Sequence, residues 1–124
     1  MLTEKDYCDY ETCVALKELG YDGCPWECSC FGAYYRNGED IFYDRLFNSE
    51  LGEDEYLRVP LYLAQKWLRD EKNLHMTIFS SSQESWMYRI TKPHQKLEEG
   101  VYGEDFTSYE DALLHAIKEC IKLC

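Results

Sequence analysis

The spacing of apolar residues changes partway through residues 59–91, and this change constrains the fold more than any other feature. Pro60 suits a first helical turn, because its missing N–H would have had no partner there and its φ is already near the helical value. Apolar residues then recur at helical spacing, at Leu61, Ala64, Trp67 and Leu68. The pattern predicts an amphipathic helix over residues 60–72.

A period of two residues follows this helix. Alternate positions are apolar in residues 74–80 and again, after a polar turn, in residues 85–91. These positions are Leu74, Met76 and Ile78 in the first segment and Trp86, Tyr88 and Ile90 in the second. Alternation is typical of strands with one buried face, and a short polar turn between two such segments is typical of a hairpin. We therefore expect residues 74–80 to pair with residues 85–91.

The C-terminal residues predict a second main helix, over residues 108–122. Thr107 with Glu110, or Ser108 with Asp111, has capping-box spacing, and acidic residues in a first turn favour the positive end of the helix dipole. One apolar face follows, made of Tyr109, Ala112, Leu113, Ala116, Ile117, Cys120 and Ile121. Such a face must pack on a sheet or on another helix.

These elements predict an α+β fold, with a small antiparallel sheet containing the central hairpin, two main helices packed on it and a short N-terminal helix. Because the helices flank a hairpin rather than single strands, a parallel doubly wound sheet is disfavoured. The C-terminal helix could cover the sheet face of Leu74 or the face of His75. A chain of 124 residues with 45% apolar residues suits one core, so we expect a single domain over residues 1–124. The expected core includes Trp67, Leu68, Ile78, Leu113 and Ile117.

The N-terminal helix has clear end signals. Asp9 is placed to cap a helix over residues 10–19, and Gly20 supplies the left-handed residue that commonly ends a helix. Tyr21 could then fold back on Leu16 in the hydrophobic contact that accompanies such an ending.

The other segments carry weaker signals. Residues 31–36 and 41–43 are strand candidates, and the Asn-Gly pair between them favours a hairpin turn. Residues 44–58 show no period and are interpreted as a surface connection, with a lid over a site as the alternative. Residues 91–103 are polar and are expected to form a loop that adds a short strand around residues 101–102.

Charge excludes some functions. The chain has 24 acidic and 13 basic residues, a net charge of −11, which opposes binding to nucleic-acid phosphates. The acidic residues are expected to keep the surface solvated, with docking on a basic partner or mimicry of DNA as the sharper alternative. No apolar run approaches the length of a membrane span, and the first residues lack a signal-peptide block, so we expect a cytoplasmic protein. The oligomeric state is left open.

Tyrosine and cysteine are both abundant. The 11 tyrosines suit core edges as well as binding surfaces, because a tyrosine can bury its ring and keep its hydroxyl hydrated. Cys24, Cys28 and Cys30 crowd three of the seven thiols into one loop, which could hold zinc if a fourth ligand arrived from elsewhere. The available fourth ligands are His75, His94 and Cys8. Because no second Cys or His pair is present, we expect reduced thiols without a metal.

No motif for catalysis or cofactor binding is present in the sequence. Glycine-rich phosphate loops, nucleophile elbows and metalloprotease or EF-hand motifs are missing, and His75, His94 and His115 are far apart. We therefore assign no catalytic, cofactor-binding or metal-binding residues. Three hypotheses remain. The first is a non-catalytic protein that binds another protein through an acidic, tyrosine-rich surface, and the second is a small metal-assisted or hydrolytic enzyme. A zinc-binding module built on Cys24, Cys28 and Cys30 is a third.

Part of the sequence resembles a group of small uncharacterised proteins of gut anaerobic bacteria and of their phages and mobile elements. The residues that carry the resemblance are Pro60, Ala64, Trp67-Leu68-Arg69, Asn73-Leu74-His75, Trp86-Met87-Tyr88, Tyr109 to Leu113 and Tyr10 to Tyr21. Residues 24–57, with their cysteine cluster, depart from the group. The resemblance implies an accessory protein of a phage or mobile element and carries over no activity or ligand.

We expect that the protein purified in reductant carries less than about one zinc per several chains. Chelation should then shift the thermal midpoint by no more than a few degrees, because folding would depend on metal only if a structural site existed. Elemental analysis and thermal unfolding with and without chelator test this. Stoichiometric zinc with unfolding on chelation would make the cluster of Cys24, Cys28 and Cys30 a structural centre.

Overall fold

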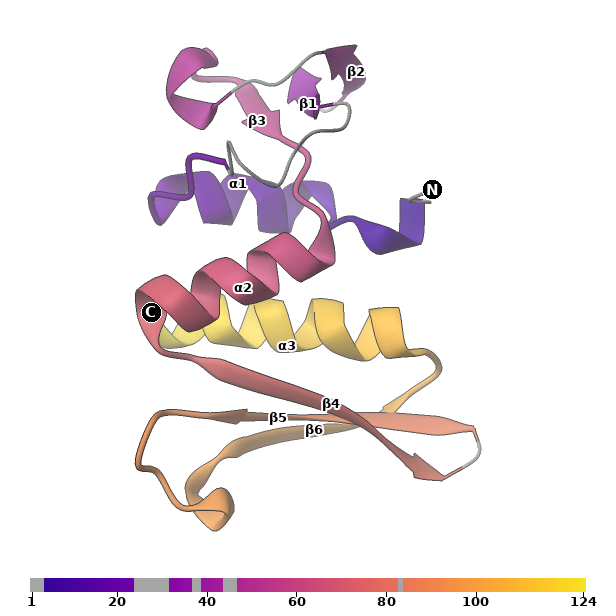
Figure 1. Ribbon diagram of the computed structural model, residues 1–124. Coiled ribbons are helices and arrows are strands. Elements are labelled where there is room, and N and C mark those ends of the chain that lie inside the picture. The colour runs from indigo at the N-terminus through magenta and orange to yellow at the C-terminus, as the bar shows by residue number, and fades with distance from the viewer. Residues whose placement is uncertain (1–3, 24–31, 37–38, 44–46, 83) are drawn as a thin grey trace. The chain divides into compact units, whose positions relative to one another are not determined.

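The computed structural model describes residues 4–23, 32–36, 39–43, 47–82 and 84–124 (Figure 1). The chain divides into two compact units, and each contains a three-stranded antiparallel sheet. Residues 7–60 form the N-terminal unit, and residues 61–124 together with residues 1–6 form the C-terminal unit. The expectation of a single domain stays a prediction.

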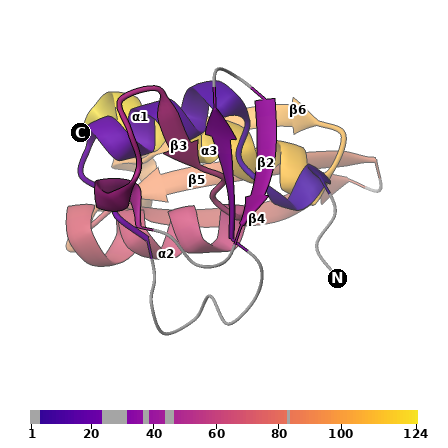
Figure 2. The same cartoon turned by 90° about the horizontal axis from the view of Figure 1, so that it is seen from above.

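The C-terminal unit confirms the predicted α+β fold. Its main elements are α2 (Leu61–Lys72), β4 (His75–Ser82), β5 (Ser85–Thr91), β6 (Val101–Phe106) and α3 (Tyr109–Leu123). Short 3-10 turns, η1 (Glu4–Asp6) and η3 (Leu97–Glu99), complete it. The strand order is β4-β5-β6, so the predicted hairpin provides two neighbouring strands. α3 packs along the sheet, and α2 packs against α3 and β4 (Figures 1 and 2).

α3 covers the sheet face that carries Leu74, Met76 and Ile78. On this face Ile78 lies opposite Tyr88 and Met76 opposite Ile90, and the two β5 residues are buried. Aromatic rings of α3 and of the sheet are in contact on this face. Tyr109 of α3 lies edge-on to Trp86 at 5.6 Å, and His115 lies 4.8 Å from Phe106. His75 and Thr77, on the opposite face, are exposed.

Local signals fix the ends of these helices. Ser108 caps α3, because its Oγ accepts from the backbone N–H of Asp111 at 3.1 Å, so the second of the two predicted capping pairs is used. α2 ends at Lys72, and the next residue, Asn73, has a φ of +56°. Asn tolerates this left-handed conformation better than most residues.

Gly103 allows the ring of Tyr88 to lie flat over β6. The two residues are opposite each other, and a Cβ built on Gly103 would lie 2.2 Å from the ring. The same ring stacks on Phe106 at 5.6 Å. Between these contacts β6 carries an extra residue, and Asp105 takes a φ of +69°, which is typical of a bulge. The short strand expected around residues 101–102 is therefore longer than predicted.

The N-terminal unit contains α1 (Tyr10–Glu18), β1 (Gly32–Arg36), β2 (Glu39–Tyr43), the 3-10 turn η2 (Asn48–Glu50) and β3 (Glu55–Leu57). The sheet order is β2-β1-β3, and β1 pairs with β2 as the predicted hairpin. The interpretation of residues 44–58 as a surface connection was wrong for β3. A strand of three residues is too short to show a period of two.

α1 begins and ends as the sequence predicts. The side chain of Asp9 accepts from the N–H of Thr12, and Gly20 has a φ of +106°. The N–H of Gly20 donates to the carbonyl of Lys17, and that of Tyr21 donates to the carbonyl of Leu16. These two bonds form a Schellman motif, and they leave Tyr21 and Leu16 both buried.

The predicted core is largely, but not completely, confirmed. Leu68, Leu113 and Ile117 are buried, whereas Trp67 and Ile78 are partly exposed. Trp67 lies at the margin of the apolar stripe of α2, where the Lys72 ammonium approaches its ring at 5.5 Å. Ile78 belongs to β4, an edge strand that has a partner on one side.

Leu68→Ala should lower the free energy of unfolding by roughly 2–5 kcal/mol. The side chain is 0% exposed, so the truncation leaves a cavity as well as losing apolar contact. Urea titration measures the change. Leu123→Ala is the control, since Leu123 is 41% exposed on α3 and its truncation should cost less than about 0.5 kcal/mol. Equal losses for the two variants would contradict the packing described.

Candidate functional site

Four tyrosines and two cationic side chains gather in the N-terminal unit. We call this group the tyrosine–cation cluster; it consists of Tyr7, Tyr10, Lys17, Tyr35, Tyr56 and Arg58. Its members come from α1, β1, β3 and the residues next to them. The cluster brings together residues as far apart in the sequence as Tyr7 and Arg58, so sequence spacing alone gives no sign of it.

Strand register places the central rings. Tyr35 of β1 lies directly opposite Tyr56 of β3, so the two side chains share one face of the sheet. Tyr10, the first residue of α1, meets both rings edge to face, at 5.0 Å from Tyr35 and 5.9 Å from Tyr56. Edge-to-face contacts of this kind are favourable and orient the rings. Tyr10 is 37% exposed, so the centre of the cluster is accessible.

A cation lies at each end of the row of rings. The Lys17 ammonium is 5.1 Å from the centre of the Tyr56 ring and donates to the carbonyls of Gly52 and Glu55, both at 2.9 Å. The Arg58 guanidinium carbon is 4.4 Å from the centre of the Tyr7 ring and 5.7 Å from that of Tyr35. All three cation–ring distances are within the range of cation–π attraction. Lys17 therefore holds the turn before β3 as well as one end of the cluster.

Acidic groups surround the Lys17 end. The pKa of the Tyr56 hydroxyl is raised above its usual value of 10, first because partial burial disfavours the phenolate and then because of Tyr10 and nearby carboxylates. Those carboxylates belong to Asp54, Glu18 and Glu53. The aromatic centre thus has a negative rim on this side.

The buried side chain of Asn48 holds β3 in place. Its Nδ2 donates to the carbonyl of Tyr21 at 2.7 Å, and its Oδ1 accepts from the N–H of Leu57 at 3.0 Å. Its own N–H donates to the carbonyl of Asp22 at 2.9 Å. Asn48 is 3% exposed and links the end of α1, η2 and β3. The sequence gives no sign of this role, because one buried amide produces no periodic pattern.

A second connection brings Tyr7 to Arg58. Tyr7 forms an antiparallel bridge with Pro60, and the N–H of Cys8 donates to the carbonyl of Val59 at 2.8 Å. The segment before α1 therefore runs beside the segment after β3. This pairing places the Tyr7 ring against the guanidinium of Arg58.

The proposed zinc ligands are only partly described. Cys24, Cys28 and Cys30 lie outside the described residues. Of the candidate fourth ligands, His75 is exposed on β4, His94 follows β5, and Cys8 is buried. Among the described residues, no three His, Cys, Asp or Glu side chains are grouped so that they could hold a metal ion.

The three histidines do not share one site. His75 lies on the sheet face opposite to α3, and His115 lies on α3 itself. The Nδ1 of His115 is 2.8 Å from the backbone carbonyl of Asp111 and 3.4 Å from its carboxylate, within one helix. His94 belongs to neither element. The histidines therefore occupy separate environments.

The Cys120 thiol is poorly suited to nucleophilic chemistry. Burial, and after it the charges of Cys124 and Glu119, raises its pKa from 9.0 to about 12. A thiol with this pKa is protonated at neutral pH, and the thiolate is the reactive form. Cys8 and Cys13 are also buried, whereas Cys124 is exposed.

Comparisons with protein-family models, curated proteins and solved structures found no match to this chain. The resemblance to proteins of gut anaerobes and their phages stays a prediction. Within the described part of the chain, no helix combines the length and apolar content needed to cross a membrane.

Asn48→Ala should lower the free energy of unfolding by about 1–3 kcal/mol. It removes two buried hydrogen bonds, one to the N–H of Leu57 and one to the carbonyl of Tyr21. Urea titration measures the loss. Ser49→Ala is the control, because the exposed Ser49 hydroxyl bonds Asp22 at 3.2 Å and its removal should change stability by less than about 0.5 kcal/mol. A neutral Asn48→Ala would contradict the role given to this side chain.

Proposed function

We propose that this chain is a non-catalytic protein-binding module that docks on its partner through the tyrosine–cation cluster. The observation that carries the proposal is the row of three rings, Tyr56, Tyr10 and Tyr35, with the accessible Tyr10 at its centre. Lys17 lies at the Tyr56 end of this row, and Arg58 lies at the other end, between the rings of Tyr35 and Tyr7. As part of the same proposal, the protein acts in the cytoplasm as an accessory protein of a phage or mobile element.

The composition of the cluster suits protein recognition. Tyrosine and arginine are enriched among the residues that contribute most to interface affinity. A tyrosine ring offers a large rigid contact area and loses little side-chain entropy on binding. Here Tyr10 is already oriented by Tyr35 and Tyr56 before any partner binds. Such preorganisation lowers the entropic cost of association.

Charge favours a basic partner surface. Residues 7–60 contain 12 acidic and four basic residues, so most of the net charge of −11 belongs to this unit. Asp54, Glu18 and Glu53 lie close enough to Tyr56 to raise its pKa. Lysine or arginine side chains of a partner could contact the ring faces and this acidic rim together, and the opposite charges would speed their encounter.

The enzyme hypothesis has less support among the described residues. Catalysis needs a nucleophile or base together with a group that orients it in an enclosed site. His115 has an orienting contact with Asp111, but the two side chains are 47% and 40% exposed rather than enclosed. The thiol of Cys120 is protonated at neutral pH. The zinc-module hypothesis depends on Cys24, Cys28 and Cys30, and the zinc measurement above tests it.

Tyr10→Ala should weaken partner binding by at least about 30-fold, because it removes the ring at the centre of the cluster. The tagged chain is used to capture proteins from a lysate of the host, and the captured protein is then titrated against each variant. Tyr102→Ala is the matched control, since Tyr102 is an exposed tyrosine of the C-terminal unit. Thermal unfolding confirms that both variants are folded.

Two results would contradict the proposal. One is equal binding by the wild type and Tyr10→Ala. The other is a lysate that yields no protein above the level of a bait-free control. Binding that grows stronger as salt is raised would contradict the basic nature of the partner, since screening weakens attraction between opposite charges.

A further inference from the structure

One face of the C-terminal sheet presents polar and apolar side chains together. α2 and α3 lie on the other face, and no described α-helix or strand of this unit covers the first one (Figure 1). Alternate residues of the three strands project from it and are exposed or partly exposed. We call this surface the Arg89 face; it includes His75, Thr77, Phe79, Met87, Arg89 and Tyr102.

Arg89 lies at the centre of this face. It belongs to the middle strand, opposite Thr77 of β4 and Tyr102 of β6. Its Nε is buried and has no hydrogen-bond partner. Within the described part of the chain its side chain forms no ion pair, although Glu104 lies only two residues from Tyr102 on β6. Buried polar groups nearly always have a partner, so a bound molecule is expected to supply one here.

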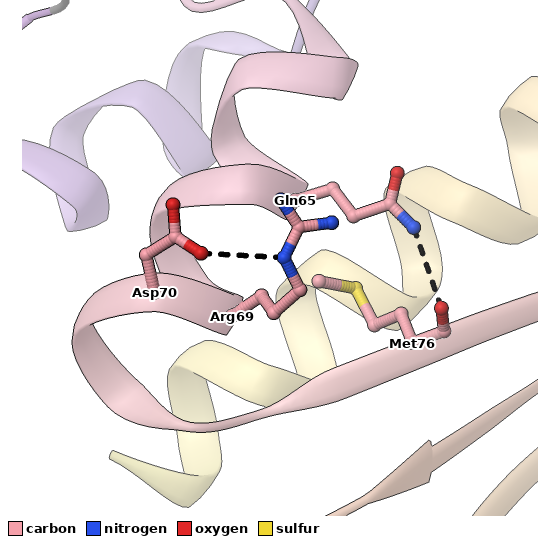
Figure 3. A network of polar contacts seen from close by, with 4 residues as sticks. All are labelled: Gln65, Arg69, Asp70 and Met76. Carbon is pink, nitrogen blue, oxygen red and sulfur yellow. Dashed lines mark hydrogen bonds and ion pairs between the residues drawn. The ribbon is translucent and has the colours of Figure 1, made fainter.

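The other arginine of this unit is in an ordinary environment. Arg69 of α2 is exposed, and its Nε is 3.3 Å from the carboxylate of Asp70 (Figure 3). Water and this carboxylate both solvate its guanidinium. Arg89 is less exposed than Arg69 and has no such carboxylate among the described residues. The two arginines therefore differ in what they can gain from an added anion.

The neighbours of Arg89 indicate the kind of ligand. A guanidinium can bind a carboxylate through two parallel hydrogen bonds, and the hydroxyls of Thr77 and Tyr102 can donate to the same anion. Phe79 and Met87 lie opposite each other on this face and add apolar contact area. A matching ligand combines one anionic group with apolar groups beside it.

Charge decides against a ligand with many negative charges. The chain has a net charge of −11, and the C-terminal unit contains 12 acidic and nine basic residues. A nucleic acid needs clustered Lys and Arg side chains to replace its counterions, and the Arg89 face has one such side chain. A single carboxylate on an otherwise uncharged segment meets the guanidinium without strong repulsion from the rest of the chain.

We propose that the Arg89 face binds a polypeptide segment of a partner protein in which one Asp or Glu is flanked by apolar residues. The carboxylate pairs with the guanidinium of Arg89, and the apolar side chains cover Phe79, Met87 and Tyr102. The guanidinium selects this occupant, because a basic or uncharged segment would bury its charge without pairing it, which is costly. The chain thus has a second binding surface, in a different unit from the tyrosine–cation cluster.

Fluorescence anisotropy with defined peptides tests this proposal on the full chain. The probes are short labelled peptides with Asp fixed at the centre and varied apolar residues on both sides of it. The tightest of them is then made again with Asn in place of Asp. We expect the Asp peptide to bind at least about tenfold more tightly than the Asn peptide, because hydrogen bonds between two charged groups are the stronger ones.

Arg89→Gln should weaken binding of the Asp peptide at least about tenfold and remove its advantage over the Asn peptide. Arg69→Gln is the matched control and should bind as the wild type does, because Arg69 is exposed and already paired with Asp70. The thermal midpoint of Arg89→Gln should not fall, since the Nε that it removes has no partner in the fold. Should this variant nevertheless fail to fold, the two peptides still test the proposal on the wild type.

Four results would overturn the proposal. They are a set of Asp peptides of which none binds, equal binding of the Asp and Asn peptides, and an Asp peptide whose binding Arg89→Gln leaves unchanged. The fourth is a single-stranded oligothymidylate that binds more tightly than the Asp peptide and loses this binding in Arg89→Gln. None of these results bears on the tyrosine–cation cluster, which Tyr10→Ala tests separately.

Discussion

The N-terminal unit depends on the two hydrogen bonds made by the side chain of Asn48. The amide of this side chain donates to the carbonyl of Tyr21, just after the end of α1, and accepts from the N–H of Leu57 in β3. Both bonds are buried, where a hydrogen bond is strong and an unpaired group is costly. Because β3 contributes Tyr56 and directly precedes Arg58, this one side chain helps to position two of the six members of the tyrosine–cation cluster.

The C-terminal unit is stabilised differently. Apolar side chains at helical and strand spacing meet between α3 and the sheet, and Ile90, Leu113 and Ile117 are buried there. Such packing is spread over many residues, so no single polar group fixes it. Because periodic apolar packing is visible in a sequence and a single buried amide is not, the elements of the C-terminal unit were easier to predict than those of the N-terminal unit.

Elements long enough to show several repeats of their apolar period could be predicted from the sequence. The helices at residues 60–72 and 108–122 and the central hairpin were predicted within two residues of their observed ends, and Asp9, Gly20 and Ser108 act as caps. β3 could not be predicted, because three residues carry no period. The cluster could not be predicted either, because its members meet through the register of Tyr35 with Tyr56 and the bridge of Tyr7 with Pro60, which sequence spacing does not reveal. The 11 tyrosines in the composition were compatible with a binding surface, but composition does not identify which tyrosines lie together.

The close approach of Gly103 to Tyr88 limits how this sheet can change during evolution. A side chain at position 103 would enter the space that the ring occupies, so it would have to be accompanied by a smaller residue at position 88. Phe106, which stacks on the same ring, would then lose its neighbour. Positions 88, 103 and 106 should therefore vary together among descendants of this sequence, and a change at one of them alone should be rare.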